Sequence, residues 1–193
     1  MPPKFKFSKD EMIKNALEIT RESGISALTA RALAAKLGCS VKPIFGLFQN
    51  MEELHQEVMH AAQQRYQNYL QEDMSKGQYP PYKASGMAYI RFAKEEPALF
   101  KLLFMRDRSD ERVTEQGEEV RPLIELIQKN TGLDEVDAYL FHLEMWVYVH
   151  GIATMIATGY LQWDTEFVSK VLTDAYIGLK YRYCGKEKKD GSN

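Results

Sequence analysis

The chain has 193 residues, of which 45% are hydrophobic and 11% aromatic, and it carries 25 Lys and Arg against 27 Asp and Glu. This composition excludes wholesale disorder, and the net charge of −2 excludes a histone-like polycation. The charge is nevertheless uneven, because residues 1–50 carry eight basic and four acidic side chains, whereas residues 51–193 carry 17 and 23. A basic segment joined to an acidic one indicates that one end of the chain binds a polyanion.

Every predicted element is a helix, because apolar residues recur at helical spacing and strand-like alternation is absent. Ser8 with Glu11 forms a capping-box pattern, and Thr29 is a suitable N-cap. Gly24 and Gly38 are expected to end the first two helices. The first four helices are expected at residues 9–23, 29–37, 40–48 and 51–73.

The segment SKGQYPPY at 75–82 is the strongest helix breaker in the chain. Further helices are expected after it, at residues 82–95, 98–105, 113–130, 134–158 and 164–183. We therefore predict an all-α fold of about nine helices. Residues 1–50 would form an N-terminal three-helix domain, residues 51–73 a connecting helix, and residues 74–193 a second helical domain.

The two cysteines, Cys39 and Cys184, lie far apart and have no partner at metal-ligand spacing. This disfavours a disulfide framework or a structural zinc site and is typical of a reducing cytosol. The first residues, MPPKFKFSKDEM, lack the apolar run of a secretory signal. The most apolar stretch, residues 145–157, is shorter than the roughly 20 residues that span a bilayer. We expect a cytoplasmic protein with no membrane partner.

The second and third helices are joined by Leu37-Gly38-Cys39-Ser40, which is typical of a helix-turn-helix motif. Gly38 can adopt the left-handed conformation of the turn, and Ser40 is expected to cap the following helix. Such a motif places its second helix in a DNA major groove. The same pattern also occurs in an ordinary helical hairpin, so a purely structural motif is the alternative.

The wider pattern over residues 13–58 resembles the N-terminal domain of the tetracycline-repressor-like (TetR) regulators. The residues that carry this resemblance are Ala16, Gly24, Thr29, Leu33-Ala34, Gly38, Ser40, Phe45, Phe48 and Glu52-Glu53-Leu54. Further along, PALFKLLFM at 97–105 and Trp146-x-x-x-His150-Gly151 resemble the ligand-binding domain variant named for its Trp-His-Gly motif.

The resemblance implies a homodimer on a pseudo-palindromic double-stranded DNA operator, with half-sites about 34–36 Å apart. The DNA-contacting positions that it implies are Thr29, Arg31, Ser40, Val41, Lys42, Pro43, Phe45, Gly46, Leu47 and Met51. Phe45 replaces the usual Tyr and Met51 the usual Lys, so two phosphate contacts are missing and the electrostatic part of affinity should fall. Base recognition would then depend on Ser40, Lys42 and apolar contacts to thymine methyl groups.

The basic N-terminal residues Lys4, Lys6 and Lys9 could contact DNA as an arm, or they could form a solvated leader. Arg31 has the same two alternatives, a phosphate contact or solvation of the second helix. The sequence leaves both questions open.

The second domain is implied to bind a small apolar or amphipathic effector between its helices. The residues expected to line this pocket are Met87, Ile90, Phe104, Met105, Trp146, His150 and Met155. His142, Trp146 and His150 share one helix face, and the alternative is a core Trp with two hydrogen-bonded histidines. We expect no metal and no cofactor, because residues two or eight apart on a helix do not converge on an ion.

The last two helices carry apolar surfaces that are wider than one neighbour requires, which indicates a four-helix interface with a second subunit. The residues predicted at this dimer interface are Phe167, Val168, Val171, Leu172, Ala175, Tyr176 and Leu179. The alternative is packing within one chain.

Taken together, these patterns predict a DNA-binding transcriptional regulator, a repressor released from its operator by a small-molecule effector. One alternative is an all-α dimeric ligand-binding protein or enzyme with a structural helix-turn-helix, although no GxSxG, P-loop or HExxH motif is present. A second alternative is a TetR-like protein that no longer binds DNA.

Overall fold

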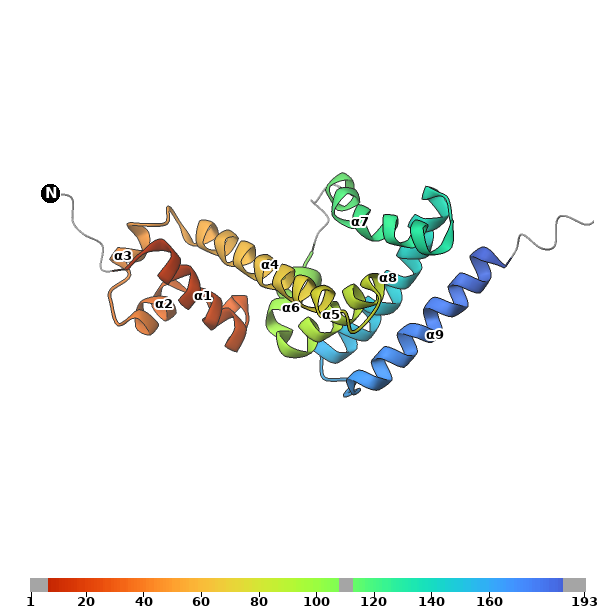
Figure 1. Cartoon of the computed structure of the whole chain (residues 1–193). Coiled ribbons are helices and arrows are strands. Elements are labelled where there is room, and N and C mark those ends of the chain that lie inside the picture. The colour runs from red at the N-terminus through yellow and green to blue at the C-terminus, as the bar shows by residue number, and fades with distance from the viewer. Residues whose placement is uncertain (1–6, 108–112, 186–193) are drawn as a thin grey trace, which may run out of the picture. The chain divides into compact units, whose positions relative to one another are not determined.

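The computed structural model describes residues 7–107 and 113–185, and within them it contains nine α-helices and no strand (Figure 1). The helices are α1 (Lys9–Ser23), α2 (Ala30–Leu37), α3 (Lys42–Phe45), α4 (Met51–Ser75), α5 (Pro81–Glu95), α6 (Pro97–Phe104), α7 (Val113–Thr131), α8 (Glu135–Ala157) and α9 (Thr165–Cys184). The all-α prediction is confirmed, and most helix ends lie within two residues of the expected positions.

The chain divides into two compact units, Met1–Asn68 with Glu95–Arg106 and Tyr69–Lys94 with Asp107–Asn193. The sequence predicts a boundary near residue 74 and places α6 in the second domain. In the structure, α6 instead packs in the first unit, where it contacts α1. The first unit is therefore discontinuous in sequence.

Local capping explains where the first helices begin and end. The Ser8 side chain accepts a hydrogen bond from the Glu11 backbone N–H at 3.1 Å, while the Glu11 carboxylate accepts one from the Ser8 backbone N–H at 2.8 Å. Thr29 caps α2 by accepting the Ala32 backbone N–H at 3.1 Å. The predicted capping box and N-cap are thus confirmed, because each satisfies a backbone donor that has no partner inside the helix.

The third helix differs from its prediction. It extends only over Lys42–Phe45, and its N-cap is Val41, which forms no side-chain capping bond, so the expected capping role of Ser40 is wrong. A short 3₁₀ helix, η1 (Ile25–Ala27), also lies between α1 and α2 where no element was predicted. Such short turns depend on neighbouring packing, and the pattern of the sequence does not reveal them.

A buried carboxylate joins three helices of the first unit. Glu96, immediately before α6, is only 4% exposed and accepts two hydrogen bonds from the Arg21 guanidinium of α1, both at 2.7 Å. Arg65 of α4 donates to the same carboxylate from Nε at 2.8 Å. Burial alone would raise the pKa of Glu96, but the hydrogen bonds from Arg21 and Arg65 outweigh it and lower that pKa. Glu96 therefore stays ionised and ties α6 to α1 and α4.

The second unit has a core between α5, α7 and α8, with α9 packed against it. The buried residues of this core are Tyr82, Ile124, Ile127, Ala138, Phe141 and Met145. Two polar pairs connect α5 with α8: the Tyr82 hydroxyl lies 3.1 Å from Nδ1 of His142, and the Tyr89 hydroxyl lies 2.9 Å from Nδ1 of His150. The Tyr–His pairs repeat after two helical turns and fix the register of these helices.

Replacing Glu96 by Gln should destabilise the protein by about 2–4 kcal/mol, because two guanidinium groups lose their shared ionised partner. The midpoint of urea unfolding, followed by circular dichroism, measures this change. Glu22→Gln is the matched control, since Glu22 is exposed and lies 3.5 Å from Lys36, and surface pairs contribute little. Equal unfolding midpoints for the two variants would contradict the role of Glu96.

Stability should also fall in mild acid because of His142, which is 8% exposed. Burial lowers the pKa of His142 below its usual 6.5, so the unfolded chain takes up a proton that the folded chain does not. As the pH falls below 6.5, protonation of His142 in the unfolded chain lowers the free energy of unfolding. This decrease is at most about 1.4 kcal/mol at pH 5.5.

His142→Gln should remove that part of the pH dependence while keeping a hydrogen-bond partner for Tyr82. Urea unfolding at pH 7.5 and 5.5 measures it, and His60→Gln, at an exposed position of α4, should keep the wild-type dependence. If His142→Gln loses as much stability between pH 7.5 and 5.5 as the wild-type protein, other groups cause the pH dependence.

Candidate nucleic-acid interface

The turn between α2 and α3 has the geometry that a helix-turn-helix requires. Gly38 adopts a left-handed conformation at φ 64°, and the backbone N–H of Cys39 donates to the carbonyl oxygen of Ala34 at 3.0 Å. Residues with a Cβ rarely adopt this conformation, so the turn favours glycine at position 38. The turn ends α2 and sets the direction in which α3 starts.

The two faces of α3 are sharply different. Ile44 is fully buried and Phe48, one turn later, is 2% exposed, so together they anchor the helix to the core of the first unit. Next to them the N-cap residue Val41 is 38% exposed and Phe45 is 48% exposed, and Lys42 is exposed as well. We call Val41, Lys42 and Phe45 the recognition face, because these side chains are accessible to a large partner.

All ten predicted DNA-contacting residues lie between the start of α2 and the start of α4, and none of them is buried. The exposed ones are Thr29, Arg31, Ser40, Val41, Lys42, Phe45 and Gly46, and the half-buried ones are Pro43, Leu47 and Met51. The structure thus brings the predicted set together on one accessible part of the first unit. Contact with DNA itself stays a prediction.

Neither alternative considered for Lys9, a DNA-contacting arm or a solvated leader, describes its position in the structure. Lys9 is the first residue of α1, and its ammonium group pairs with Glu57 at 2.7 Å and Glu53 at 3.1 Å, both on α4. These hydrogen bonds raise the pKa of Lys9, which is occupied in holding α1 to α4. Lys4 and Lys6 lie outside the described residues.

The first unit carries a small positive charge. Residues 1–68 and 95–106 contain 11 Lys and Arg and nine Asp and Glu. The basic excess of four in residues 1–50 falls to two, because residues 51–68 add three acidic and one basic side chain and residues 95–106 add no net charge. Arg31 and Lys42 are exposed, and neither forms an ion pair with a described residue. These two side chains are the cations next to the recognition face that could meet a polyanion.

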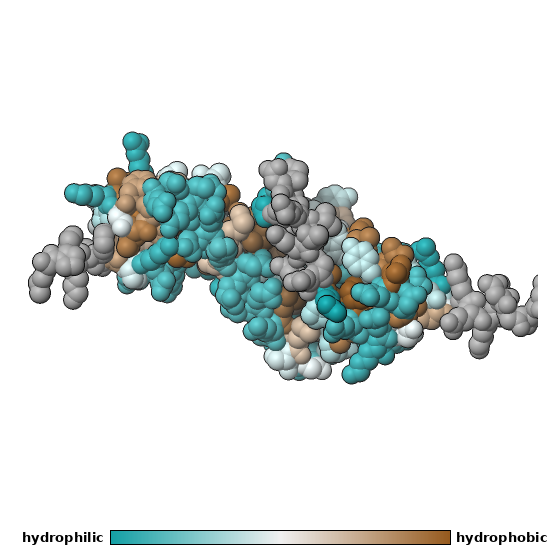
Figure 2. Space-filling model, turned by 90° about the horizontal axis from the view of Figure 1, so that it is seen from above, coloured by the Kyte–Doolittle hydropathy of each residue, from teal (hydrophilic) through white to brown (hydrophobic). Residues whose placement is uncertain are grey.

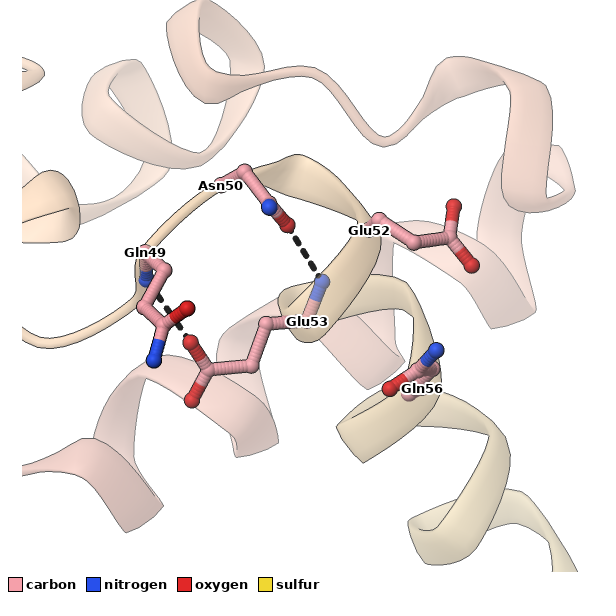
Figure 3. Close-up of a pocket in the computed structure, with 5 residues that line it drawn as sticks. All are labelled: Gln49, Asn50, Glu52, Glu53 and Gln56. Atoms are coloured by element: carbon pink, nitrogen blue, oxygen red, sulfur yellow. Dashed lines mark hydrogen bonds between the residues drawn. The ribbon is translucent and has the colours of Figure 1, made fainter.

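A polar cavity of about 230 Å³ lies where α4 begins (Figure 3). The residues that line it are Gln49, Asn50, Glu52, Glu53 and Gln56. Asn50 caps α4 by accepting the Glu53 backbone N–H at 2.9 Å, and the Glu53 carboxylate accepts the Gln49 backbone N–H at 2.7 Å. This hydrogen bond and then Lys9 lower the pKa of Glu53. The cavity contains none of the residues predicted to bind an effector.

Four side chains form an aromatic and polar cluster between α5 and α8, in the region predicted for the effector. Trp146 stacks on His150 at a ring distance of 5.0 Å, and His150 hydrogen-bonds Tyr89 and lies 3.4 Å from the Thr154 hydroxyl. Burial lowers the pKa of His150, so its ring is neutral in this setting. Trp146 is 43% exposed, which argues against the alternative of a core tryptophan.

The other predicted effector residues do not form one set with this cluster. Met87 and Ile90 are buried in the second unit, and Met155 is half-buried there. Phe104 belongs to the first unit, where its ring packs on Tyr66 at 5.2 Å, and Met105 follows it with 41% of its side chain exposed. Tyr89 was not among the predicted effector residues, although its seven-residue spacing from Tyr82 is close to the eight-residue spacing of His142 and His150 and could have indicated it.

The residues predicted for a dimer interface mostly face the interior of their own chain. Val168 and Leu172 are each 3% exposed, and Ala175, Tyr176 and Leu179 pack on the core of the second unit. Val168 and Leu172 therefore have little apolar area left for a second subunit, whereas Ala175, Tyr176 and Leu179 are only partly buried, so the interface itself stays a prediction. Val171 is half-buried, and only Phe167, at 44%, is exposed.

A different set of apolar side chains is exposed on α8 and α9. Figure 2 shows brown, hydrophobic surface among teal side chains on the face that it draws. The large apolar residues that form a stripe on α8 and extend onto α9 are Val136, Leu140, Leu143, Val147, Ile177 and Tyr181, each more than 40% exposed. By length and composition α8 could cross a membrane. Its apolar character has a simpler cause, since one side is buried in the second unit and the other carries this stripe.

Comparisons with known proteins agree with these features. Residues 82–175 match the family model described as the tetracycline repressor-like C-terminal domain. The fold is similar to the crystal structure of a TetR-like transcriptional regulator from Rhodococcus sp. RHA1, with a TM-score of 0.67 and 14% identity over 94% of this chain and 100% of that one. It is also similar to a TetR family protein from Vibrio parahaemolyticus, with a TM-score of 0.59 and 18% identity over 88% and 96%. No curated protein matches the sequence.

Proposed function

Because this chain belongs to the tetracycline repressor-like family, we propose that it is a sequence-specific DNA-binding transcriptional regulator. The observation that carries the proposal is the accessible recognition face on α3, presented by the Gly38 turn while Ile44 and Phe48 anchor the helix behind it. A helix held in this way can enter a major groove without disturbing its own domain.

The regulator acts as a homodimer through α8 and α9. A helix that is apolar on all sides must be covered on all sides, and one protomer covers only the inner side of α8. A second copy that presents the same stripe would bury Val136, Leu140 and Val147 in a self-complementary interface. The dimer places two recognition helices on successive major grooves of a pseudo-palindromic operator.

The effector is a small apolar or amphipathic molecule that contacts the Trp146–His150–Tyr89 cluster. The half-exposed indole provides an apolar surface, and the neutral imidazole and the phenol provide directional hydrogen bonds. Such a combination supports recognition of a ring or chain that carries one polar group.

The connection between effector and operator follows from the path of the chain. The chain leaves the second unit at Lys94, forms α6 in the first unit, and returns at Asp107. A ligand that favours one arrangement of α5 therefore shifts the equilibrium of the Glu96 contacts with Arg21 and Arg65, and α4 changes its tilt. Operator affinity then falls, and the protein acts as a repressor released by its effector.

Selection from a random duplex library should yield a pseudo-palindromic site, and Lys42→Ala should weaken binding to it by about tenfold, because a lysine contact to guanine is lost. Fluorescence anisotropy at fixed salt measures this affinity. Lys101→Ala is the control, since Lys101 is an exposed cation on α6, and its affinity should stay near wild type.

Failure of the folded protein to bind any duplex at low salt would overturn the regulator assignment. It would favour the alternative of an all-α ligand-binding protein or enzyme in which the helix-turn-helix is only structural.

Ile177→Asp should convert the dimer to a monomer, because a carboxylate would be buried at the centre of an apolar interface. Sedimentation velocity measures the change. Met74→Asp is the matched control: Met74 is also exposed, at 39%, but lies near the end of α4, away from the stripe. If both variants sediment like the wild type, the dimer uses another surface.

A further inference from the structure

We infer that the recognition face selects its operator by apolar contacts of Val41 and Phe45 with thymine methyl groups, so that each half-site is rich in A·T pairs. The inference rests on the proposed DNA-binding function and adds to it the chemical class of the site. It follows from the exposure of α3, from its lack of hydrogen-bonding side chains and from the charge of the first unit.

Packing within the first unit does not explain why Val41 and Phe45 are exposed. Val41 and Phe45 are four residues apart, so they stand one above the other on the same face of α3. Among the described residues of that unit, the large apolar side chains classed as exposed are Val41, Phe45 and Met105. Two of these three therefore occur at the N-cap and at the last residue of a four-residue helix, next to the fully buried Ile44.

The segment around α3 offers few hydrogen bonds to base edges. Between Cys39 and Phe48 the sequence is CSVKPIFGLF, and its polar side chains besides the cysteine are Ser40 and Lys42. Adenine is typically recognised by Asn or Gln, cytosine by Asp or Glu, guanine by Arg or Lys, and the thymine methyl group by apolar side chains. Lys42 can therefore identify one guanine, and the remaining selectivity of α3 depends on methyl groups.

Charge does not compensate for the missing hydrogen bonds. The first unit has 11 basic and nine acidic side chains, a net charge of only +2, and Lys9 is paired with Glu53 and Glu57. Few phosphates are neutralised, so the salt dependence of binding should be shallow. A protein with so little electrostatic affinity depends more on the base contacts that α3 makes.

Replacing thymine by uracil in the selected duplex tests this inference, because uracil pairs in the same way and lacks only the methyl group. Binding of the wild-type protein should weaken about fourfold for each contacted methyl group that is removed. Val41→Ala and Phe45→Ala should each bind the thymine duplex more weakly and should each show a smaller difference between the thymine and uracil duplexes, because one of the two apolar contacts remains. Met74→Ala, at an exposed apolar position outside the recognition face, should keep the full difference.

The possible outcomes separate this inference from the proposed function. If selection yields no site, the regulator proposal fails. If it yields a site that the wild-type protein binds equally well with thymine and with uracil, the regulator proposal stands and the methyl inference is overturned. Because the uracil comparison uses the wild-type protein, it decides the question even if Phe45→Ala does not fold.

Discussion

The structure depends on one buried carboxylate shared by two guanidinium groups. Glu96 lies between Arg21 of α1 and Arg65 of α4, and this arrangement makes α6 part of the first unit although its neighbours in sequence belong to the second. An ionised group can be buried at 4% exposure only because several charged hydrogen bonds replace its water. The same contacts hold together α1, α4 and α6, the helices that support the helix-turn-helix.

The second unit is organised differently, around α8. Its inner side carries His142 and Met145 in the core, its Tyr–His pairs fix it to α5, and its outer side presents an apolar stripe. A helix of this kind is suited to contacts with its own core and with a second copy at once. This explains why a helix with the composition of a membrane span is compatible with the proposed dimer.

Helix positions and caps were predictable because they depend on nearby residues. The Ser8–Glu11 capping box and the Gly38 turn are interactions of neighbours, and helical spacing of apolar residues identified nearly every helix. Which side of α9 is buried was less predictable, because apolar residues cover a wide part of the helix surface. Periodicity alone cannot show that Val168 and Leu172 pack inward while Ile177 faces out. The partners of Lys9, 44 and 48 residues away along the chain, could not be read from local sequence either.

The sequence by itself determined an all-α chain, the limits of its helices and the helix-turn-helix with its left-handed Gly38, because these features arise from propensities, capping and spacing within a few residues. It also determined the chemistry of α3 and its flanking residues 39–48, whose polar side chains besides Cys39 are Ser40 and Lys42. Only the tertiary structure decided that α6 belongs to the first unit, that Lys9 is paired with two carboxylates of α4, and which side of α9 is exposed. These outcomes depend on contacts between residues far apart in sequence, which burial and charge pairing select and local patterns do not encode.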